Sequence, residues 1–134
     1  MPATTIGNEL SRLRGGKAPG PDGISTDLLR AAPFGLAVAL ASLFTGSLGT
    51  GHVPSSWRTS CIRLLPKPGR DLTEPSHYRP VALSSALGKL LERILARRLL
   101  VWCERHDLLP AEQSGFRPAR DAPEQVVLLA QRAV

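Results

Sequence analysis

The sequence has few cysteines and no long hydrophobic run. Cys61 and Cys103 are its two cysteines, too few for a disulfide framework. Both lie among apolar residues, so we expect reduced, buried thiols in an intracellular protein, with nucleus and cytoplasm not distinguished. The most apolar stretch, residues 34–44, is about half as long as a bilayer span. No basic segment followed by an apolar one opens the chain, so neither a signal peptide nor a membrane partner is predicted.

The residue groupings that usually mark a catalytic or metal site are also missing. Cys103 and His106 are three residues apart, but the sequence has no second Cys/His pair that could complete the four ligands of a zinc site. No Ser-His-Asp or Cys-His arrangement stands out, and no phosphate-binding glycine loop is present. Asp22 and Asp27 straddle a loop and a helix start, which suits a turn-former and a first-turn residue better than a pair of metal ligands.

Positive charge is concentrated in the middle of the chain. The formal net charge is +6, and residues 58–105 alone contribute +6, from ten basic and four acidic side chains. Of the 17 basic residues, 14 are arginine, whose planar fork of donors matches phosphate oxygens. This balance is consistent with a polyanionic partner, and equally with a solvated basic surface that binds nothing in particular.

Glycine and proline divide the first part of the chain. A short helix is predicted over residues 6–14, followed by a loop at residues 15–23 that has too much glycine and proline for regular structure. Ser25 is a good N-cap for a helical pair that Pro33 interrupts. One apolar face of the second helix is expected to be buried, and it comprises Leu36, Leu40, Leu43 and Phe44.

A strand pair and a long helix are predicted in the second part. The extended runs 57–65 and 79–83 flank a polar, turn-rich tip, which favours an antiparallel pair. A helix then begins at Ser84 or Ser85. Its apolar face is expected to be core and contains Leu87, Leu90, Leu91, Ile94, Leu95, Leu99 and Trp102. The expected fold class is α+β, mainly helical with a small antiparallel strand pair.

Two sets of cations are candidates for binding phosphate. Lys67, Arg70 and Arg79 bracket the tip between the strands, where a rigidly held loop can place charge against a triphosphate or a nucleic-acid backbone. Lys89, Arg93 and Arg97 form a stripe at i, i+4 spacing that can lie along phosphates. For the first set the alternative is solvated loop charge, and for the second it is an ordinary amphipathic helix.

Five segments, in order and over nearly the whole chain, resemble the start of a reverse transcriptase domain of non-LTR (LINE-type) retrotransposons. They are residues 17–24 (KAPGPDGI), 53–58 (VPSSWR), 62–71 (IRLLPKPGRD), 78–85 (YRPVALSS, continuing to 89–94 and 98–99) and 113–118 (QSGFRP). The resemblance implies a right-hand polymerase fold, of which this chain is the N-terminal fingers portion, truncated before the catalytic palm. Its implied parts are a leading segment at 1–24, a helical pair at 25–51, a strand–tip–strand unit at 57–85 and helices at 86–134 leading toward the palm.

The resemblance also implies roles for particular residues. Lys67 and Arg79 match the family residues near the triphosphate of the incoming nucleotide, and Arg63 and Arg70 are candidates for contact with the template. The Pro-Gly-Pro-Asp-Gly loop at residues 19–23 is implied to lie at the leading edge of the fingers. The family's catalytic aspartates lie beyond the matched region, so no catalytic residue and no metal ligand is expected here, although the complete enzyme uses magnesium.

We therefore expect a piece of an RNA-directed DNA polymerase that is inactive alone. Its expected partners are an RNA template, a primer duplex and a deoxynucleoside triphosphate, and its oligomeric state is left open. A further amphipathic pattern begins at Pro123 and reaches Val134 without a cap, which predicts a chain cut from a longer protein. The alternatives are a non-catalytic nucleic-acid-binding module and a degenerate retrotransposon remnant.

Overall fold

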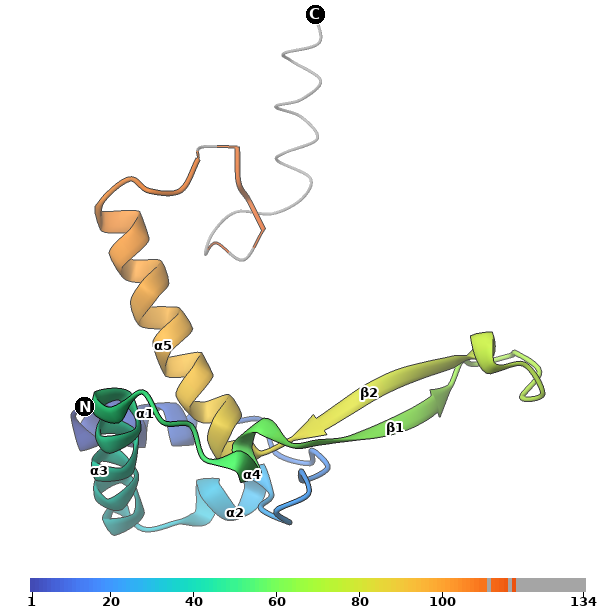
Figure 1. Ribbon diagram of the computed structural model, residues 1–134, viewed down its shortest axis with the longest axis horizontal. Coiled ribbons are helices and arrows are strands. Elements are labelled where there is room, and N and C mark those ends of the chain that lie inside the picture. The colour runs from blue at the N-terminus through green and yellow to red at the C-terminus, as the bar shows by residue number, and fades with distance from the viewer. Residues whose placement is uncertain (111, 116, 118–134) are drawn as a thin grey trace, which may run out of the picture. The chain divides into compact units, whose positions relative to one another are not determined.

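The described chain combines helices with one pair of strands, which confirms the α+β class (Figure 1). The computed structural model describes residues 1–110, 112–115 and 117, so the helix predicted from Pro123 lies outside them. The chain divides into two compact units, Met1–Ile94 and Leu95–Val134. Its elements are α1 (Ala3–Ser11), α2 (Thr26–Ala31), α3 (Phe34–Thr50), α4 (Ser55–Arg58), β1 (Ser60–Pro66), the short 3-10 helix η1 (Pro75–His77), β2 (Tyr78–Ser84) and α5 (Ala86–Arg105).

The helix ends follow local chemistry. Ser25 caps α2, since its hydroxyl oxygen accepts from the Leu28 amide at 3.1 Å, as predicted. Pro33 separates α2 from α3, and Gly51 ends α3 in the left-handed conformation at φ 65°. α1 begins and ends three residues earlier than predicted, because Pro2 is tolerated at its N-terminal boundary.

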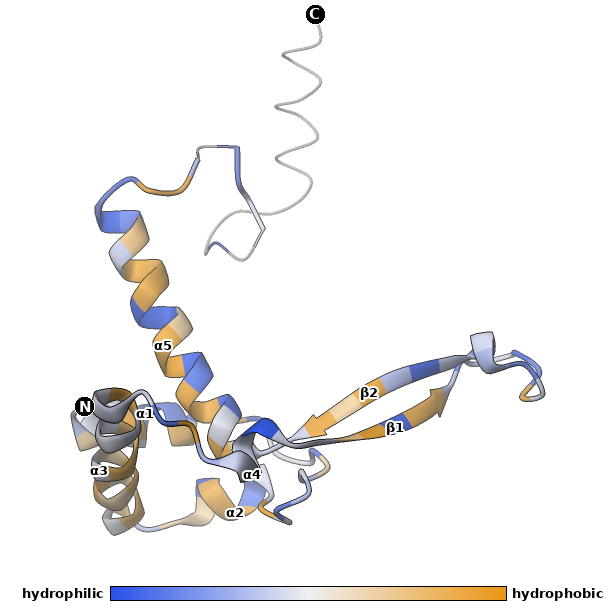
Figure 2. Ribbon diagram, viewed as in Figure 1, coloured by the Kyte–Doolittle hydropathy of each residue, from blue (hydrophilic) through white to orange (hydrophobic). Residues whose placement is uncertain are grey.

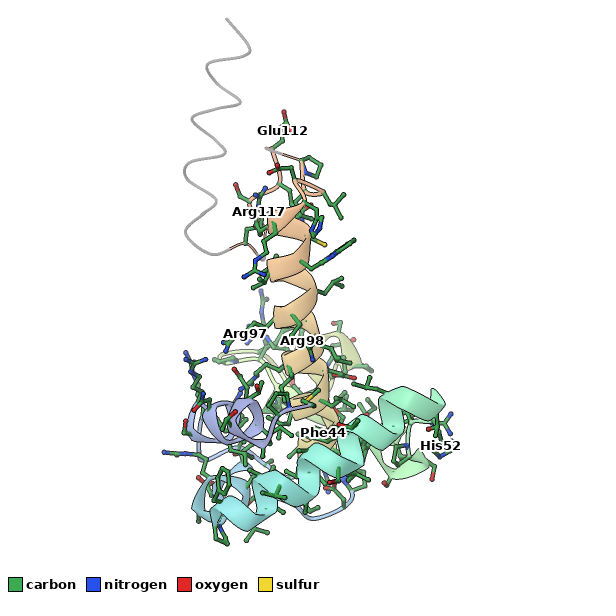
Figure 3. The ribbon with its side chains drawn as sticks, turned by 90° about the vertical axis from the view of Figure 1, so that its left-hand side faces the viewer. Phe44, His52, Arg97, Arg98, Glu112 and Arg117 are labelled. Carbon is green, nitrogen blue, oxygen red and sulfur yellow. The ribbon has the colours of Figure 1, made fainter. Side chains whose placement is uncertain are left out.

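The core of the first unit lies between α1 and α3, which pack on each other. α3 buries Ala37, Leu40, Ala41 and Phe44. Leu43, predicted to be buried, is 46% exposed, because the buried stripe runs through the alanines instead. Phe44 is fully buried, and Figure 3 labels it on α3.

Trp57 lies in a helical turn rather than in a strand, and its half-buried ring contacts the core. The extended run predicted from residue 57 is wrong at its first two residues, because Pro54 starts one helical turn and its carbonyl accepts from the Trp57 amide at 3.0 Å. The turn sets the Trp57 ring edge-to-face against Phe44, with centroids 5.6 Å apart and planes at 84°. β1 therefore starts only at Ser60.

The amphipathic helix α5 is buried over its first half only. Ser85 caps it, since its hydroxyl accepts from the Gly88 amide at 3.4 Å. Leu90, Leu91 and Ile94 are buried as predicted. The prediction that Leu99 and Trp102 are core is wrong, because they are 60% and 51% exposed.

The two strands form an antiparallel sheet by themselves. The register runs from Ser60 opposite Ser84 to Pro66 opposite Tyr78, which confirms the predicted pair. Most of its side chains are exposed on both faces, and Figure 2 shows hydrophilic bands interrupting the otherwise apolar ribbon.

Two expectations based on composition are tested by the same structure. Cys61 and Cys103 are free thiols, but they are half-buried rather than buried, and Cys61 is so because it lies on the exposed sheet. None of the described helices is both apolar enough and long enough to serve as a membrane span.

Candidate nucleic-acid interface

The strand register places two of the predicted site residues on one face of the sheet. Arg63 lies opposite Val81, and Leu65 lies opposite Arg79. Residues directly opposite each other share a face, and so do residues two apart along a strand. Arg63 and Arg79 are therefore diagonal neighbours on one face, and both are exposed.

Lys67 continues the same register just beyond β1. Its amide donates to the His77 carbonyl at 2.8 Å, which extends the ladder by one pair. By alternation, Lys67 falls in the odd-numbered set that contains Arg63. Lys67 is half-buried as a residue; its ammonium donates to the carbonyl of Ser76 at 2.8 Å, and two of its three N–H groups remain available to a ligand.

The opposite face of the sheet carries no charge. Beyond the Ser60–Ser84 pair at one end, it presents six residues: Ile62, Leu64, Pro66, Tyr78, Pro80 and Ala82. We call this set the even face and the set with Arg63 and Arg79 the odd face. The hairpin thus has one cationic face and one uncharged face.

The tip between the strands is fixed by its own hydrogen bonds. Asp71 accepts from both the amide and the hydroxyl of Thr73, at 3.1 and 2.8 Å. The side-chain hydrogen bond from Thr73 is the main cause that lowers the pKa of Asp71 below its ordinary value, and the amide of Thr73 adds to it. His77 Nδ1 donates to the Asp71 carbonyl at 2.6 Å, and the Tyr78 hydroxyl donates to the Leu72 carbonyl at 3.0 Å.

Arg70 sits in the turn that opens this tip. Its amide donates to the Lys67 carbonyl at 3.3 Å, and Gly69 before it has a φ of 68°, which suits glycine. Arg70 is exposed and belongs to neither face of the sheet. The structure therefore brings Arg63 and Arg79 together, places Lys67 next in their register and leaves Arg70 apart from them.

The glycine- and proline-rich loop packs against the point where β2 passes into α5. A methyl group at Gly20 would meet the carbonyl carbon of Ser84 at 2.7 Å and the amide nitrogen of Ser85 at 2.8 Å. Asp22 holds the following turn by accepting from the Ile24 amide at 3.1 Å. Asp27 accepts from the Gly16 amide at 2.9 Å from its place in the first turn of α2. Both acids are thus structural, as predicted.

Residues that would hold a metal are not gathered in the described chain. Over residues 1–110, 112–115 and 117, no three His, Cys, Asp or Glu side chains lie close enough to bind one ion. The described residues therefore do not form a site for the magnesium ion that the resemblance implies for the complete enzyme.

A two-point ion pair at the end of α5 was missed from the sequence. Arg117 donates through Nε and Nη2 to the two carboxylate oxygens of Glu104, both at 2.7 Å. Its Nη1 also donates to the carbonyl of Pro110 at 2.8 Å. The hydrogen bond to Glu104 raises the pKa of the guanidinium.

Another charged residue was also missed. Glu9 is buried in α1, with a carboxylate oxygen 3.3 Å from Arg12 Nη1. Pairs such as Arg117 with Glu104 lie across a turn, where sequence spacing gives no signal of contact. The Glu9 pair has i, i+3 spacing, which was a usable signal.

Comparison with known proteins gives relatives of one kind. The chain is 33% identical over 121 residues to an RNA-directed DNA polymerase from mobile element jockey of Drosophila melanogaster, covering 90% of this chain and 13% of that protein. It is 36% identical over 110 residues to a probable RNA-directed DNA polymerase from transposon BS of the same species, covering 82% and 12%. No protein-family model matches the chain.

A third relative extends the similarity to another element. The chain is 38% identical over 100 residues to a retrovirus-related Pol polyprotein from type-1 retrotransposable element R2 of Popillia japonica, covering 75% of this chain and 13% of that protein. The chain thus spans 12–13% of the length of these relatives. It is therefore a homologue of one segment of the RNA-directed DNA polymerases, or reverse transcriptases, of non-LTR retrotransposons.

Proposed function

We propose that the β1–β2 hairpin is part of the fingers of a reverse transcriptase and that its odd face binds the incoming nucleotide. In this proposal Lys67 and Arg79 contact the triphosphate, and Arg63 and Arg70 contact the template strand. The observation that carries the proposal is the register, which puts Arg63 and Arg79 on one face and Lys67 next to them. The similarity to RNA-directed DNA polymerases supports it.

The state of these cations suits phosphate binding. In the described part of the chain, the guanidinium groups of Arg63, Arg70 and Arg79 have no hydrogen-bond or salt-bridge partner. The nearest acid in sequence, Asp71, is held by Thr73. Exposed guanidinium groups without an acidic partner bind phosphate oxygens without first breaking an internal pair.

The chemistry assigned to this chain is binding and positioning. Nucleotidyl transfer needs metal ions that stabilise charge on the reacting oxygens, and the described residues do not gather ligands for them. The proposal therefore includes no catalytic step and no template-dependent incorporation by this chain alone. The segments 1–24, 25–51, 57–85 and 86–134 are proposed to be successive parts of the fingers and of the helices leading toward the palm.

Nucleotide binding by charge-loss variants tests the proposal. Binding of a deoxynucleoside triphosphate to the 134-residue chain would be measured by calorimetry. We expect Arg79→Ala and Lys67→Ala each to weaken it roughly tenfold, as loss of one charged phosphate contact implies. Arg14→Ala is the matched control, since Arg14 is exposed and lies outside the hairpin, and it should leave affinity unchanged.

Two results would count against this function. Equal affinity in wild type, Lys67→Ala and Arg79→Ala would remove the nucleotide site. If, in addition, the double variant Lys89→Ala and Arg93→Ala lost binding to a nucleic-acid duplex, the chain would be a nucleic-acid-binding module that uses the exposed cations of α5. Template-dependent incorporation by the chain alone would contradict the proposed lack of activity.

A further inference from the structure

The second unit carries an exposed pair of stacked rings on α5. Trp102 is 51% exposed. Its ring centroid lies 4.8 Å from that of His106, with the planes at 36°. The two residues are four apart on the helix and so occupy the same face. A half-exposed tryptophan that contacts another ring on one side leaves apolar π surface open to a ligand.

A hydrogen bond holds the histidine ring of this pair. His106 Nδ1 lies 2.8 Å from the Trp102 carbonyl oxygen. A carbonyl oxygen only accepts, so Nδ1 carries the hydrogen and the ring cannot turn without losing this bond. The rings are therefore arranged before any ligand arrives, which lowers the entropy cost of binding.

Arginines flank the ring pair on the same helix. Arg98 precedes Trp102 by one turn, and Arg105 follows it by three residues. Both are exposed, and Figure 3 shows Arg98 on the middle turns of α5. Within residues 1–110, 112–115 and 117, neither guanidinium has a hydrogen-bond or salt-bridge partner.

One of the two acids near the ring pair is already engaged by another residue. The carboxylate of Glu104 is occupied by Arg117. Asp107 follows the helix, in the left-handed conformation at φ 51°. The face thus offers an aromatic platform with cations at both ends.

We propose that Trp102 and His106, with Arg98 and Arg105, form a binding site for single-stranded nucleic acid, in which an unpaired base stacks on Trp102 and the arginines contact adjoining phosphates. Open aromatic faces combined with cations are what sequence-tolerant single-strand binding requires, because every base has a π face. Bases in a duplex are already stacked and cannot take this position. The inference stands on α5 alone and does not depend on the hairpin binding a nucleotide.

Tryptophan emission tests the stacking directly. A short oligouridine would be titrated into wild type and into Trp102→Leu, in which Trp57 is the remaining tryptophan. We expect the oligomer to quench wild-type emission and to leave Trp102→Leu emission unchanged. Affinity should fall roughly five- to hundredfold in Trp102→Leu, the effect of losing one base stack. A duplex of the same length should not quench.

The cationic contribution has its own readout and control. Arg98→Ala with Arg105→Ala should make the slope of log affinity against log salt shallower by about 0.7 for each lost contact. Arg14→Ala should leave the slope unchanged. Trp102→Leu should bind a deoxynucleoside triphosphate with wild-type affinity, so failure of the hairpin proposal and failure of this one are distinguishable.

Other occupants of this face would give different results. If Trp102→Ala weakened oligouridine binding while Trp102→Leu did not, the face would serve apolar packing, and stacking would be refuted. Absence of quenching in wild type would also overturn the site, whatever the variants do. Because Trp102 is half-exposed, its variants should unfold at the wild-type temperature, and thermal unfolding would check this.

Discussion

Gly20 lies against the backbone of Ser84, so closely that a Cβ atom at Gly20 would sit 2.7 Å from the Ser84 carbonyl carbon and oxygen. Backbone atoms at the junction of β2 and α5 cannot move aside as a flexible side chain would. We predict that Gly20→Ala lowers the free energy of unfolding by about 1–3 kcal/mol, the usual effect of overpacking. Chemical denaturation would measure it.

A second glycine gives the matched control for this substitution. Gly46 lies within α3, and a Cβ atom there would meet nothing within 4 Å. Gly46→Ala should raise stability by about 1 kcal/mol, because alanine favours the helix. If both variants shifted stability in the same direction, the tight approach of the loop to Ser84 would be refuted.

Phe44 and Phe34 differ in burial on the same helix. Phe44 is fully buried against Trp57, whereas Phe34 is 63% exposed at the first turn. We predict that Phe44→Ala costs about 3–5 kcal/mol through cavity formation. Phe34→Ala should stay within about 0.5 kcal/mol of wild type. Near-equal losses in denaturant unfolding would show that the core has been placed on the wrong face of α3.

The Thr73 hydroxyl stabilises the charged form of Asp71 in the tip. We predict that Thr73→Ala raises the pKa of Asp71 toward the ordinary aspartate value of about 3.9, because the strongest hydrogen bond to the carboxylate is lost. A carboxyl titration followed by NMR would measure it. Thr50→Ala, far along the chain in α3, should leave the value unchanged.

The sign of the associated pH dependence follows from the lowered pKa. The folded-state pKa of Asp71 lies below the unfolded one, so its contribution to the tip is present above the unfolded value. It is lost as pH falls through the folded value. Tip stability that increased on acidification below pH about 4 would contradict this.

The pairing of Arg117 with Glu104 should hold the turns after α5. In Glu104→Gln the acceptor loses its charge and one of its two oxygens, so the two-point contact is broken. We predict faster amide hydrogen exchange at Gln113 and Arg117, whose amides bond to Pro110 and Ser114. Glu92→Gln changes an exposed position of the same helix and should leave both rates unchanged.

Local signals in the sequence predicted the element types well. Ser25, Pro33 and Gly51 act at helix ends as their chemistry requires, and the two extended runs pair as expected. Trp57 was misassigned because one helical turn after a proline carries no periodicity to detect. Lys67, Arg70 and Arg79 were chosen from resemblance and loop position, and only the register showed which of them share a face.

Burial on α5 could not be predicted from periodicity alone. The apolar stripe from Leu87 to Trp102 continues past the point where side chains become exposed. A periodic pattern identifies the apolar face of a helix, but it does not show how many turns of that face other elements cover. The ring contact of Trp102 with His106 was missed for the same reason, because Trp102 was expected to be core.

The alternation of the two hairpin faces limits how this segment can change in length. Deleting one residue of β1 would shift the pairing by one for the part of the strand on one side of the deletion, and would move the side chains of that part to the opposite face. Insertions between Pro68 and Ser76 lie outside both strands and leave the pairing of β1 with β2 unchanged. Among related sequences, gaps should therefore collect in the tip and be absent from both strands.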